Sequence, residues 1–195
     1  WDEFAADIAG IDAPFFGVTG NHDVSNEKMT SYLERRFGPT YYSFVYGGAL
    51  FLVLNSQDNP NPAVEYRSGI GESQVEFAKE ALAAHADVRW TFVFMHQPLF
   101  VKKDYPDVPG WGKIEGMLAA RPHTVFAGHW HEYARHEVNG HVYYRLGTTG
   151  GASQLRGAER GELDQVVWVT MTKDGPVVAN LDLKGIYPDD VSTDQ

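Results

Sequence analysis

The sequence predicts an α/β domain, and three observations lead to that prediction. Up to about residue 130, segments with helical periodicity alternate with short apolar runs that are typical of buried strands. Three of those runs, residues 14–19, 90–95 and 124–127, are followed directly by loops that carry histidines. After residue 132 the chain contains β-hairpin patterns only. Because the carboxyl ends of strands in α/β sheets lie along one edge, we expect the histidine loops to converge there.

Helices are expected at four places, which are residues 1–8, 26–37, 72–86 and about 114–119. The first has its apolar side chains on one face, and the second stops at Gly38-Pro39, a strong helix breaker. The third places Val75, Ala78 and Leu82 at the spacing of a core-facing helix stripe.

Three hairpins are expected, which pair residues 41–46 with 50–55, 133–138 with 141–146, and 166–172 with 177–183. Each pair flanks turn residues, and Asn139-Gly140 is the strongest short hairpin signal among them. Two polar loops, residues 56–71 and 101–112, separate the elements. Long loops in compact domains are often functional, so these two are candidates for lining a site.

Composition limits the function classes. The hydrophobic fraction of 43% over 195 residues predicts one soluble globular domain, residues 1–187, followed by a polar C-terminal tail, residues 188–195, that frays. A formal net charge of −10 argues against nucleic acid or an anionic membrane as a partner. A phosphate ester is still compatible with that charge, since a bound divalent metal reverses the local field. The chain has no cysteine, which excludes disulfides and thiolate chemistry.

The run Thr124-Val125-Phe126-Ala127-Gly128-His129-Trp130-His131 carries the sharpest signal. Alternation along an extended backbone would send His129 and His131 to the same side, and Gly128 would keep bulk away from that place. Neutral imidazole is the commonest metal-binding side chain. A lone His-x-His pair is weak, but His22 and His96 also follow apolar runs. Without thiolates, the expected ions are Mn, Fe, Zn or Co.

Three motifs in this order resemble the calcineurin-like metallophosphoesterases. They are Gly20-Asn21-His22-Asp23, the lone His96 at a strand end, and Gly128-His129-Trp130-His131. The resemblance covers the chain from about Pro14 to Gly151. It implies an α/β fold in which a β-sandwich is flanked by helices, and a dinuclear site for divalent metal ions.

The resemblance also implies a role for each matching residue. Asn21, His96 and His129 match ligands of the second metal, and His131 matches a ligand of the first. His22 matches the residue that stabilises or protonates the leaving oxygen, and Asp23 matches the carboxylate that orients it. The implied reaction is hydrolysis of a small phosphoester by a metal-bound hydroxide.

Two motifs of the family are missing from these 195 residues. The chain contains no Asp-x-His tripeptide and no Gly-Asp pair. The resemblance implies that they belong to a βαβ portion of roughly 30 residues or more that is expected before Trp1, as is any export signal. Without that portion the first metal would keep only His131, and sheet edges would be exposed.

Several alternatives remain open at this point. His22 could be a turn residue, and His96 could simply end a strand. Gly147 to Gly151 is interpreted as a turn near the site rather than a phosphate loop, because it lacks the lysine of a Walker motif. The main hypothesis is a phosphoester hydrolase. The alternative is an impaired fragment or partner-binding module that keeps at most one metal and pairs with a second copy or another chain at an exposed sheet edge.

Overall fold

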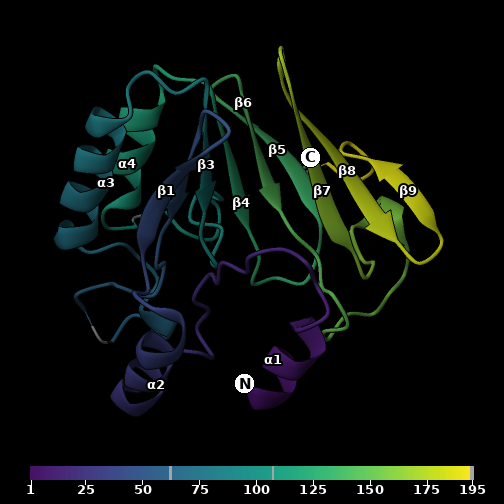
Figure 1. The fold of residues 1–195 in the computed structure, drawn as a ribbon, viewed down its shortest axis with the longest axis horizontal. Coiled ribbons are helices and arrows are strands. Elements are labelled where there is room, and N and C mark those ends of the chain that lie inside the picture. The colour runs from purple at the N-terminus through teal and green to yellow at the C-terminus, as the bar shows by residue number, and fades with distance from the viewer. Residues whose placement is uncertain (62, 107, 194–195) are drawn as a thin grey trace.

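The larger sheet of the molecule positions the histidine loops. In the computed structural model, which describes residues 1–61, 63–106 and 108–193, it has six strands in the order β1-β2-β3-β4-β6-β5 (Figure 1). The strands are β1 (Tyr42–Tyr46), β2 (Ala49–Val53), β3 (Trp90–Phe94), β4 (His123–Ala127), β5 (Ala134–Val138) and β6 (His141–Arg145). Strands β2, β3, β4 and β6 run parallel, and β1 and β5 are antiparallel edge strands from two of the predicted hairpins. The predicted α/β class is therefore confirmed.

Two helices cover one face of this sheet. They are α3 (Glu72–Ala84), which connects β2 to β3, and α4 (Trp111–Leu118), which connects β3 to β4. Parallel neighbouring strands require such crossovers, because the chain must return to the edge where the first strand began before the second strand can start. A tight hairpin joins antiparallel strands only. Leu50, Val93 and Ile114 are fully buried in the core between helices and sheet. The helix expected at about 114–119 starts earlier, at Trp111, because this buried indole belongs to the same core.

A smaller sheet packs on the opposite face and makes the molecule a two-sheet sandwich. It has the order β7-β8-β9, with β7 (Val166–Thr172), β8 (Gly175–Asp182) and β9 (Gly185–Pro188). Ala49, Phe92 and Phe126 of the larger sheet share a core cluster with Val178 of β8. Two short 3₁₀ turns, η1 (Glu65–Arg67) and η2 (Ala158–Arg160), lie in loops.

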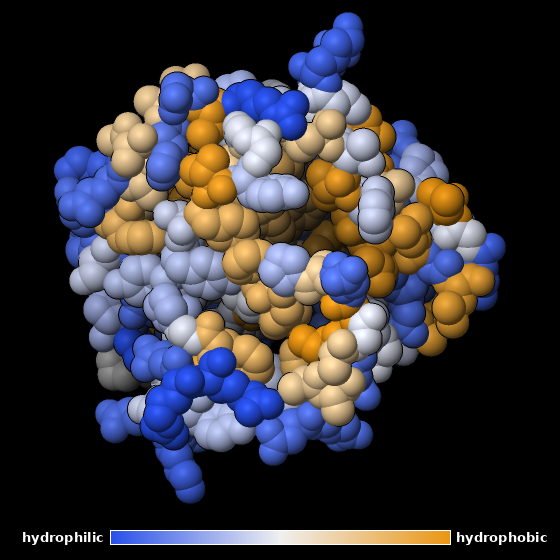
Figure 2. Space-filling view, in the orientation of Figure 1, coloured by the Kyte–Doolittle hydropathy of each residue, from blue (hydrophilic) through white to orange (hydrophobic). Residues whose placement is uncertain are grey.

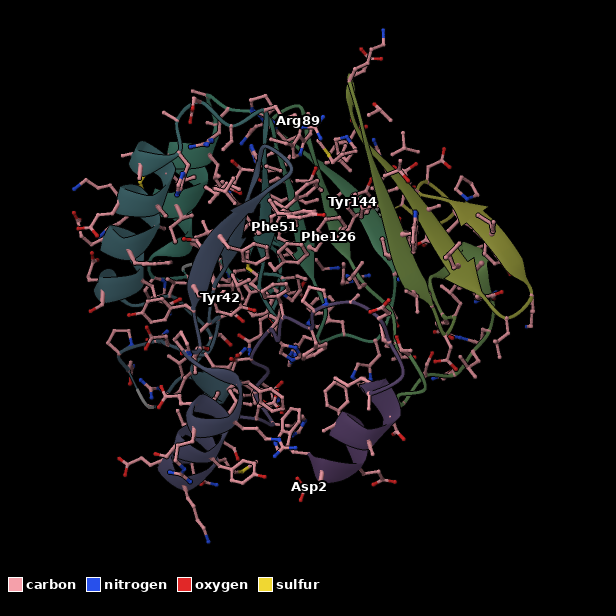
Figure 3. All side chains as sticks on the ribbon, viewed as in Figure 1. Asp2, Tyr42, Phe51, Arg89, Phe126 and Tyr144 are labelled. Carbon is pink, nitrogen blue, oxygen red and sulfur yellow. The ribbon has the colours of Figure 1, made fainter. Side chains whose placement is uncertain are left out.

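The smaller sheet leaves part of the larger sheet open. A hollow of about 640 Å³ is lined by Phe16, Phe44, Phe51 and Phe94, and a second of about 300 Å³ extends from there to Val169 of β7. Figure 2 shows this hollow rimmed by apolar residues, and Figure 3 labels Phe51 and Phe126, which both line the second hollow. Among the strands of the described residues, β7 pairs only with β8, so its outer edge borders the hollow.

The strand predicted over residues 14–19 is wrong. This segment is extended, but it belongs to neither sheet. It touches β1 through side chains: the Tyr42 hydroxyl donates to the carbonyl of Gly17 at 2.8 Å, and the ring of Phe16 stacks on Phe44 at 4.3 Å. Half of the Phe16 side chain stays exposed. An apolar run becomes a strand only where the backbone of a neighbouring strand pairs with it. Residues 14–19 contact β1 through side chains and do not pair with its backbone.

Two helices precede β1 and lie at one end of the sheet (Figure 1). They are α1 (Asp2–Ile8) and α2 (Glu27–Phe37), as predicted from periodicity. Asn26 caps α2, since its side-chain oxygen accepts from the amide of Met29 at 3.1 Å. The loop between these helices carries Asn21 and His22 to the ends of β3 and β4. None of the described helices has the length and apolar character needed to cross a membrane.

The C-terminal segment is anchored, so the expectation that it frays is wrong for residues 189–193. The hydroxyl of Tyr144 donates to the carboxylate of Asp189 at 2.7 Å, and that of Tyr133 donates to its carbonyl. The amide of Arg135 donates to the carbonyl of Ser192 at 3.0 Å. Buried tyrosine hydroxyls need acceptors, and this segment supplies them. Residues 194–195 lie outside the described residues, and the division into domain and tail stays a prediction.

His123 predicts how stability responds to acid. The ring, at the start of β4, is 2% exposed, and Nδ1 donates to the carbonyl of Arg121 at 2.9 Å. Nε2 therefore accepts from the hydroxyl of Tyr143 at 3.0 Å, and His141 stacks on the ring. Burial lowers the pKa of His123. Because the unfolded chain then binds the proton more readily, the free energy of unfolding should fall as pH drops below about 6.5.

When the pH falls from about 7.5 to about 5, we expect the unfolding free energy of His123→Gln to drop less than that of the natural protein. The measurement is urea unfolding at both pH values. Only the change with pH counts, because the substitution itself costs stability at every pH. The lowered pKa values of His96 and His129 act alike in both proteins and cancel in the difference. Equal losses in the two proteins would show that His123 does not contribute to acid sensitivity.

Candidate metal centre

Three side chains from three separate elements meet at the carboxyl ends of β3 and β4. His96 Nε2 lies 2.8 Å from Asn21 Oδ1 and 3.1 Å from His129 Nδ1, and the third side of this triangle is 3.2 Å. An imidazole nitrogen carries at most one proton, so hydrogen bonds cannot satisfy all three contacts together. Three lone-pair atoms that face one another form an arrangement that a bound cation satisfies.

The parallel pairing of β3 with β4 brings the two histidines together. Phe94 stands opposite Phe126 in the register, and beyond the strands the amide of Gly128 donates to the carbonyl of His96 at 2.8 Å. His96 and His129 each follow their strand by two residues, so both rings leave the sheet at the same edge. Convergence at this edge was predicted, and the pairing confirms it for these two side chains.

The expected alternation of His129 and His131 is wrong. Both residues have left-handed backbones, with φ of 76° and 58°, so the chain is not extended here. The ring of His129 faces Asn21, whereas Nδ1 of His131 donates to the carbonyl of Ala152 at 2.7 Å. Left-handed conformations are uncommon for residues other than glycine and cluster at functional sites.

His131 is nevertheless held as a ligand-type histidine. Its Nδ1–H is used by the carbonyl of Ala152, which leaves the lone pair of Nε2 for another partner. Histidines that bind metals commonly donate their other ring N–H to a carbonyl or a carboxylate. Ala152 follows the glycine-rich turn of residues 147–151, which the sequence placed near the site. Sequence analysis did not identify the Ala152 carbonyl, because backbone acceptors carry no residue signature.

Gly20, rather than Gly128, is the glycine that makes room for the histidines. A Cβ at Gly20 would lie 3.2 Å from two ring atoms of His96, whereas one at Gly128 would lie 4.0 Å from the ring, an ordinary contact. The expectation that Gly128 keeps bulk away is therefore wrong. Asp23 closes the turn around Gly20, since its carboxylate accepts from the amide of Gly20 at 2.9 Å.

Burial and mutual repulsion keep the central imidazoles neutral. Burial, followed by the charges of His129, His22 and His131, lowers the pKa of His96 to about 4. Burial and then His131 and His22 lower the pKa of His129 as well. Both rings therefore keep free lone pairs at neutral pH, which is the form that binds a metal. The same interactions place His22 and His131 within electrostatic range of the triangle.

The donor set fits a borderline divalent ion. Donor atoms about 3 Å apart match neighbouring ligands around an ion with bonds of about 2.1 Å. Two imidazole nitrogens and one amide oxygen suit Mn, Fe, Co or Zn better than a thiolate-seeking ion. Within residues 1–61, 63–106 and 108–193, no group of three or more His, Cys, Asp or Glu side chains is suited to a metal ion. The third donor of this set is an amide, so the ligands carry no negative charge.

A cavity of about 430 Å³ opens beside this centre. His129 and Trp130 line one side of it, and both polar loops singled out in the sequence line the rest through residues such as Tyr66 and Tyr105. The ring of Tyr66 meets that of His129 edge-on, with centroids 5.5 Å apart. The lengths of the two loops were the signal for this cavity, but which side chains face it could not be deduced from them.

Comparisons with known proteins found curated relatives that are named as phosphatases. No family model matches the chain. The human protein named serine/threonine-protein phosphatase CPPED1 is 31% identical over 138 residues, which are 62% of this chain and 42% of that protein. Its counterpart from Rattus norvegicus is 34% identical over 143 residues, which are 65% of this chain and 44% of that protein. The chain thus spans less than half the length of these curated relatives.

A solved structure shares the fold. It is described as GAP50, the anchor in the inner membrane complex of Plasmodium, and it superposes with a TM-score of 0.63 over 90% of this chain and 65% of its own. The two sequences are only 14% identical, so the likeness concerns the fold alone.

The contrast between the two glycines gives a direct test. Gly20→Ala should displace the ring of His96 and cost about 1 kcal/mol of unfolding free energy, because the neighbours must move to admit the methyl group. Gly128→Ala is the matched control and should change neither the position of the His96 ring nor the unfolding free energy. Urea unfolding and the histidine ring resonances in a ¹H–¹³C spectrum provide the measurement. If Gly128→Ala moves the His96 resonances as much as Gly20→Ala does, the packing described here is wrong.

Proposed function

We propose that this chain carries the metal-binding part of a calcineurin-like phosphoester hydrolase. The observation that carries the proposal is the triangle of Asn21 Oδ1, His96 Nε2 and His129 Nδ1, with sides of 2.8 to 3.2 Å. The motifs around these residues and the relatives named as phosphatases support it. The substrate class that follows is a small phosphoester.

Each residue has a distinct task in this proposal. Asn21, His96 and His129 would hold one divalent ion, which supplies Lewis-acid polarisation of a phosphoryl oxygen and an activated water when bound. His131 would direct its free Nε2 toward a first-metal position. His22 would donate a proton to the leaving oxygen, and histidine is the side chain that most often transfers protons in enzymes. Asp23 would act on His22 through the turn that it closes with Gly20.

The proposal for this chain is one ion at the triangle. The sequence lacks Asp-x-His and Gly-Asp pairs, so a dinuclear site would need carboxylates from outside these 195 residues.

Metal content tests the ligand assignment. After dialysis against Mn²⁺ or Zn²⁺ and removal of the free ion, the natural protein should retain about one ion per chain, as the three-ligand triangle allows. His96→Ala should retain almost none, whereas His85→Ala, a control at the end of α3, should match the natural protein. Inductively coupled plasma mass spectrometry gives the count. Equal metal content in His96→Ala and His85→Ala would show that the triangle does not bind the metal ion.

His22 tests the reaction separately from metal binding. His22→Ala should lower the turnover of bis-p-nitrophenyl phosphate by about 10²- to 10⁴-fold, the range for loss of a general acid. Its metal content should stay at the level of the natural protein. Unchanged turnover in this variant would show that His22 has no part in the reaction. No turnover in the metal-loaded natural protein would contradict the hydrolase proposal for this chain.

The open aromatic face favours a second candidate function, a partner-binding module. In this proposal an extended apolar segment adds a strand to the outer edge of β7 and covers Phe51 and Phe94. The support is the exposure of β7 at the hollow, where Val169 is 37% exposed, and the apolar hollow beside it. An unpaired edge next to an apolar face is a template for another strand.

Hydrogen exchange on the chain alone tests this second candidate. Alternate amides of β7 should exchange as fast as solvent-exposed amides, because only one edge of the strand is paired. Amides of β8, which is paired on both sides, are the internal control. Protection along the whole of β7 in a protein that light scattering shows to be monomeric would mean that the edge is already covered.

A further inference from the structure

The cavity beside the metal centre has a lining of unusual chemistry. Three aromatic side chains, Tyr66, Tyr105 and Trp130, line it together with two carboxylates, those of Glu65 and Asp104. No lysine or arginine is among the described residues that line it. Aromatic faces and carboxylates together attract organic cations, whereas a neutral or anionic group gains nothing from the carboxylates.

The aromatic rings are held in position by their surroundings. The guanidinium of Arg145, which is 8% exposed, lies 4.8 Å from the ring centre of Trp130, and its Nε donates to the carbonyl of Glu132. The ring of Tyr105 lies beside that of Trp130, with centroids 6.4 Å apart. Trp130 is thus fixed from outside the cavity, and the stacking of Arg145 shows that this ring already holds one cation.

Tyr66 is held in an uncommon backbone conformation. Its φ is 52° and that of Arg67 is 50°, a left-handed pair without glycine. The side chain of Arg67 donates twice to the carbonyl of Asn59, at 3.1 and 2.8 Å, and Asn59 Nδ2 donates to the carbonyl of Ser68 at 2.8 Å. These bonds close the loop and leave half of the Tyr66 side chain exposed at the rim of the cavity.

The carboxylates are available to a ligand. Within the described part of the chain, neither Glu65 nor Asp104 forms an ion pair with a lysine or arginine. Glu65 lies close enough to act on the charge of His129, and both carboxylates act on Tyr105. The negative charge is therefore placed along the cavity from its outer rim to the metal-binding histidine.

We propose that this cavity binds an organic cation, an ammonium or a guanidinium group, carried by the phosphoester whose phosphate lies at Asn21, His96 and His129. The inference rests on the proposed function for the position of the phosphate. It deepens that function by naming the substrate class: a phosphoester with a positively charged group a short chain away from phosphorus. The rings of Tyr66, Tyr105 and Trp130 contact the cation, and Glu65 and Asp104 balance its charge.

Binding of a bare cation tests the cavity without any reaction. The probes for this test are tetramethylammonium and methylguanidinium. Each would be titrated by calorimetry into the metal-free protein in the presence of a chelator. At least one probe should bind, and Glu65→Gln combined with Asp104→Asn should weaken it about tenfold, as should Tyr66→Ala. Glu80→Gln, at an exposed carboxylate on α3, is the matched control and should bind as the natural protein does.

The two probes identify the source of the cation. Tighter binding of tetramethylammonium indicates a quaternary ammonium such as that of a choline ester, and tighter binding of methylguanidinium indicates an arginine-like group. Failure of both probes to bind, or equal binding by the double variant and the natural protein, would overturn the inference. Circular dichroism of each variant establishes that it is folded.

Turnover separates this inference from the proposed function. The substrate pair is p-nitrophenyl phosphorylcholine and p-nitrophenyl 3,3-dimethylbutyl phosphate, which share the leaving group and the shape but differ by one charge. For a site that prefers ammonium, the metal-loaded protein should show kcat/KM about tenfold higher for the charged ester, and the double variant should lose this preference. If tetramethylammonium was the tighter probe, equal turnover of both esters overturns the inference and leaves the hydrolase intact. No turnover of either ester, with probe binding retained, overturns the hydrolase and leaves the cavity.

Discussion

The parallel pairing of β3 with β4 is the constraint on which the candidate site depends. Adjacent parallel strands end at the same edge, so any side chains that follow them by the same number of residues are brought within a few ångströms. His96 and His129 satisfy this condition, and the bond from the Gly128 amide to the His96 carbonyl extends the pairing past the strands themselves. Asn21 then completes the triangle from a loop that belongs to neither strand.

Prediction from the sequence succeeded for elements that depend on neighbouring residues in the chain. It failed for segments whose structure depends on contacts with residues far away in the sequence. Asn139-Gly140 specifies its own hairpin, and Gly38-Pro39 ends its own helix, so both were predicted from the local sequence. Residues 14–19 have the composition of a buried strand, yet pairing depends on a backbone neighbour that no local pattern reveals. The anchoring of residues 189–193 depends in the same way on Tyr133 and Tyr144, which lie more than forty residues earlier.

The residues of the candidate site also fall into those that the sequence predicted and those that it did not. Convergence of strand ends predicted that His96 and His129 lie together, whereas Asn21 was predicted from the family resemblance and follows a segment that is not a strand. The orientation of His131 could not be predicted, because its left-handed backbone and its bond to Ala152 arise from the fold of the loop. The cavity beside His129 was indicated only by the lengths of two loops, whereas its charge and aromatic lining follow from how those loops close.

The central claim is that Asn21, His96 and His129 form one cation-binding triangle. An anomalous-difference map from a crystal grown with Mn²⁺ tests this claim most directly. The account predicts a peak about 2.1 Å from His96 Nε2 and His129 Nδ1, with Asn21 Oδ1 at a similar distance. A map without density at the triangle, or with peaks only at exposed carboxylates, would contradict it.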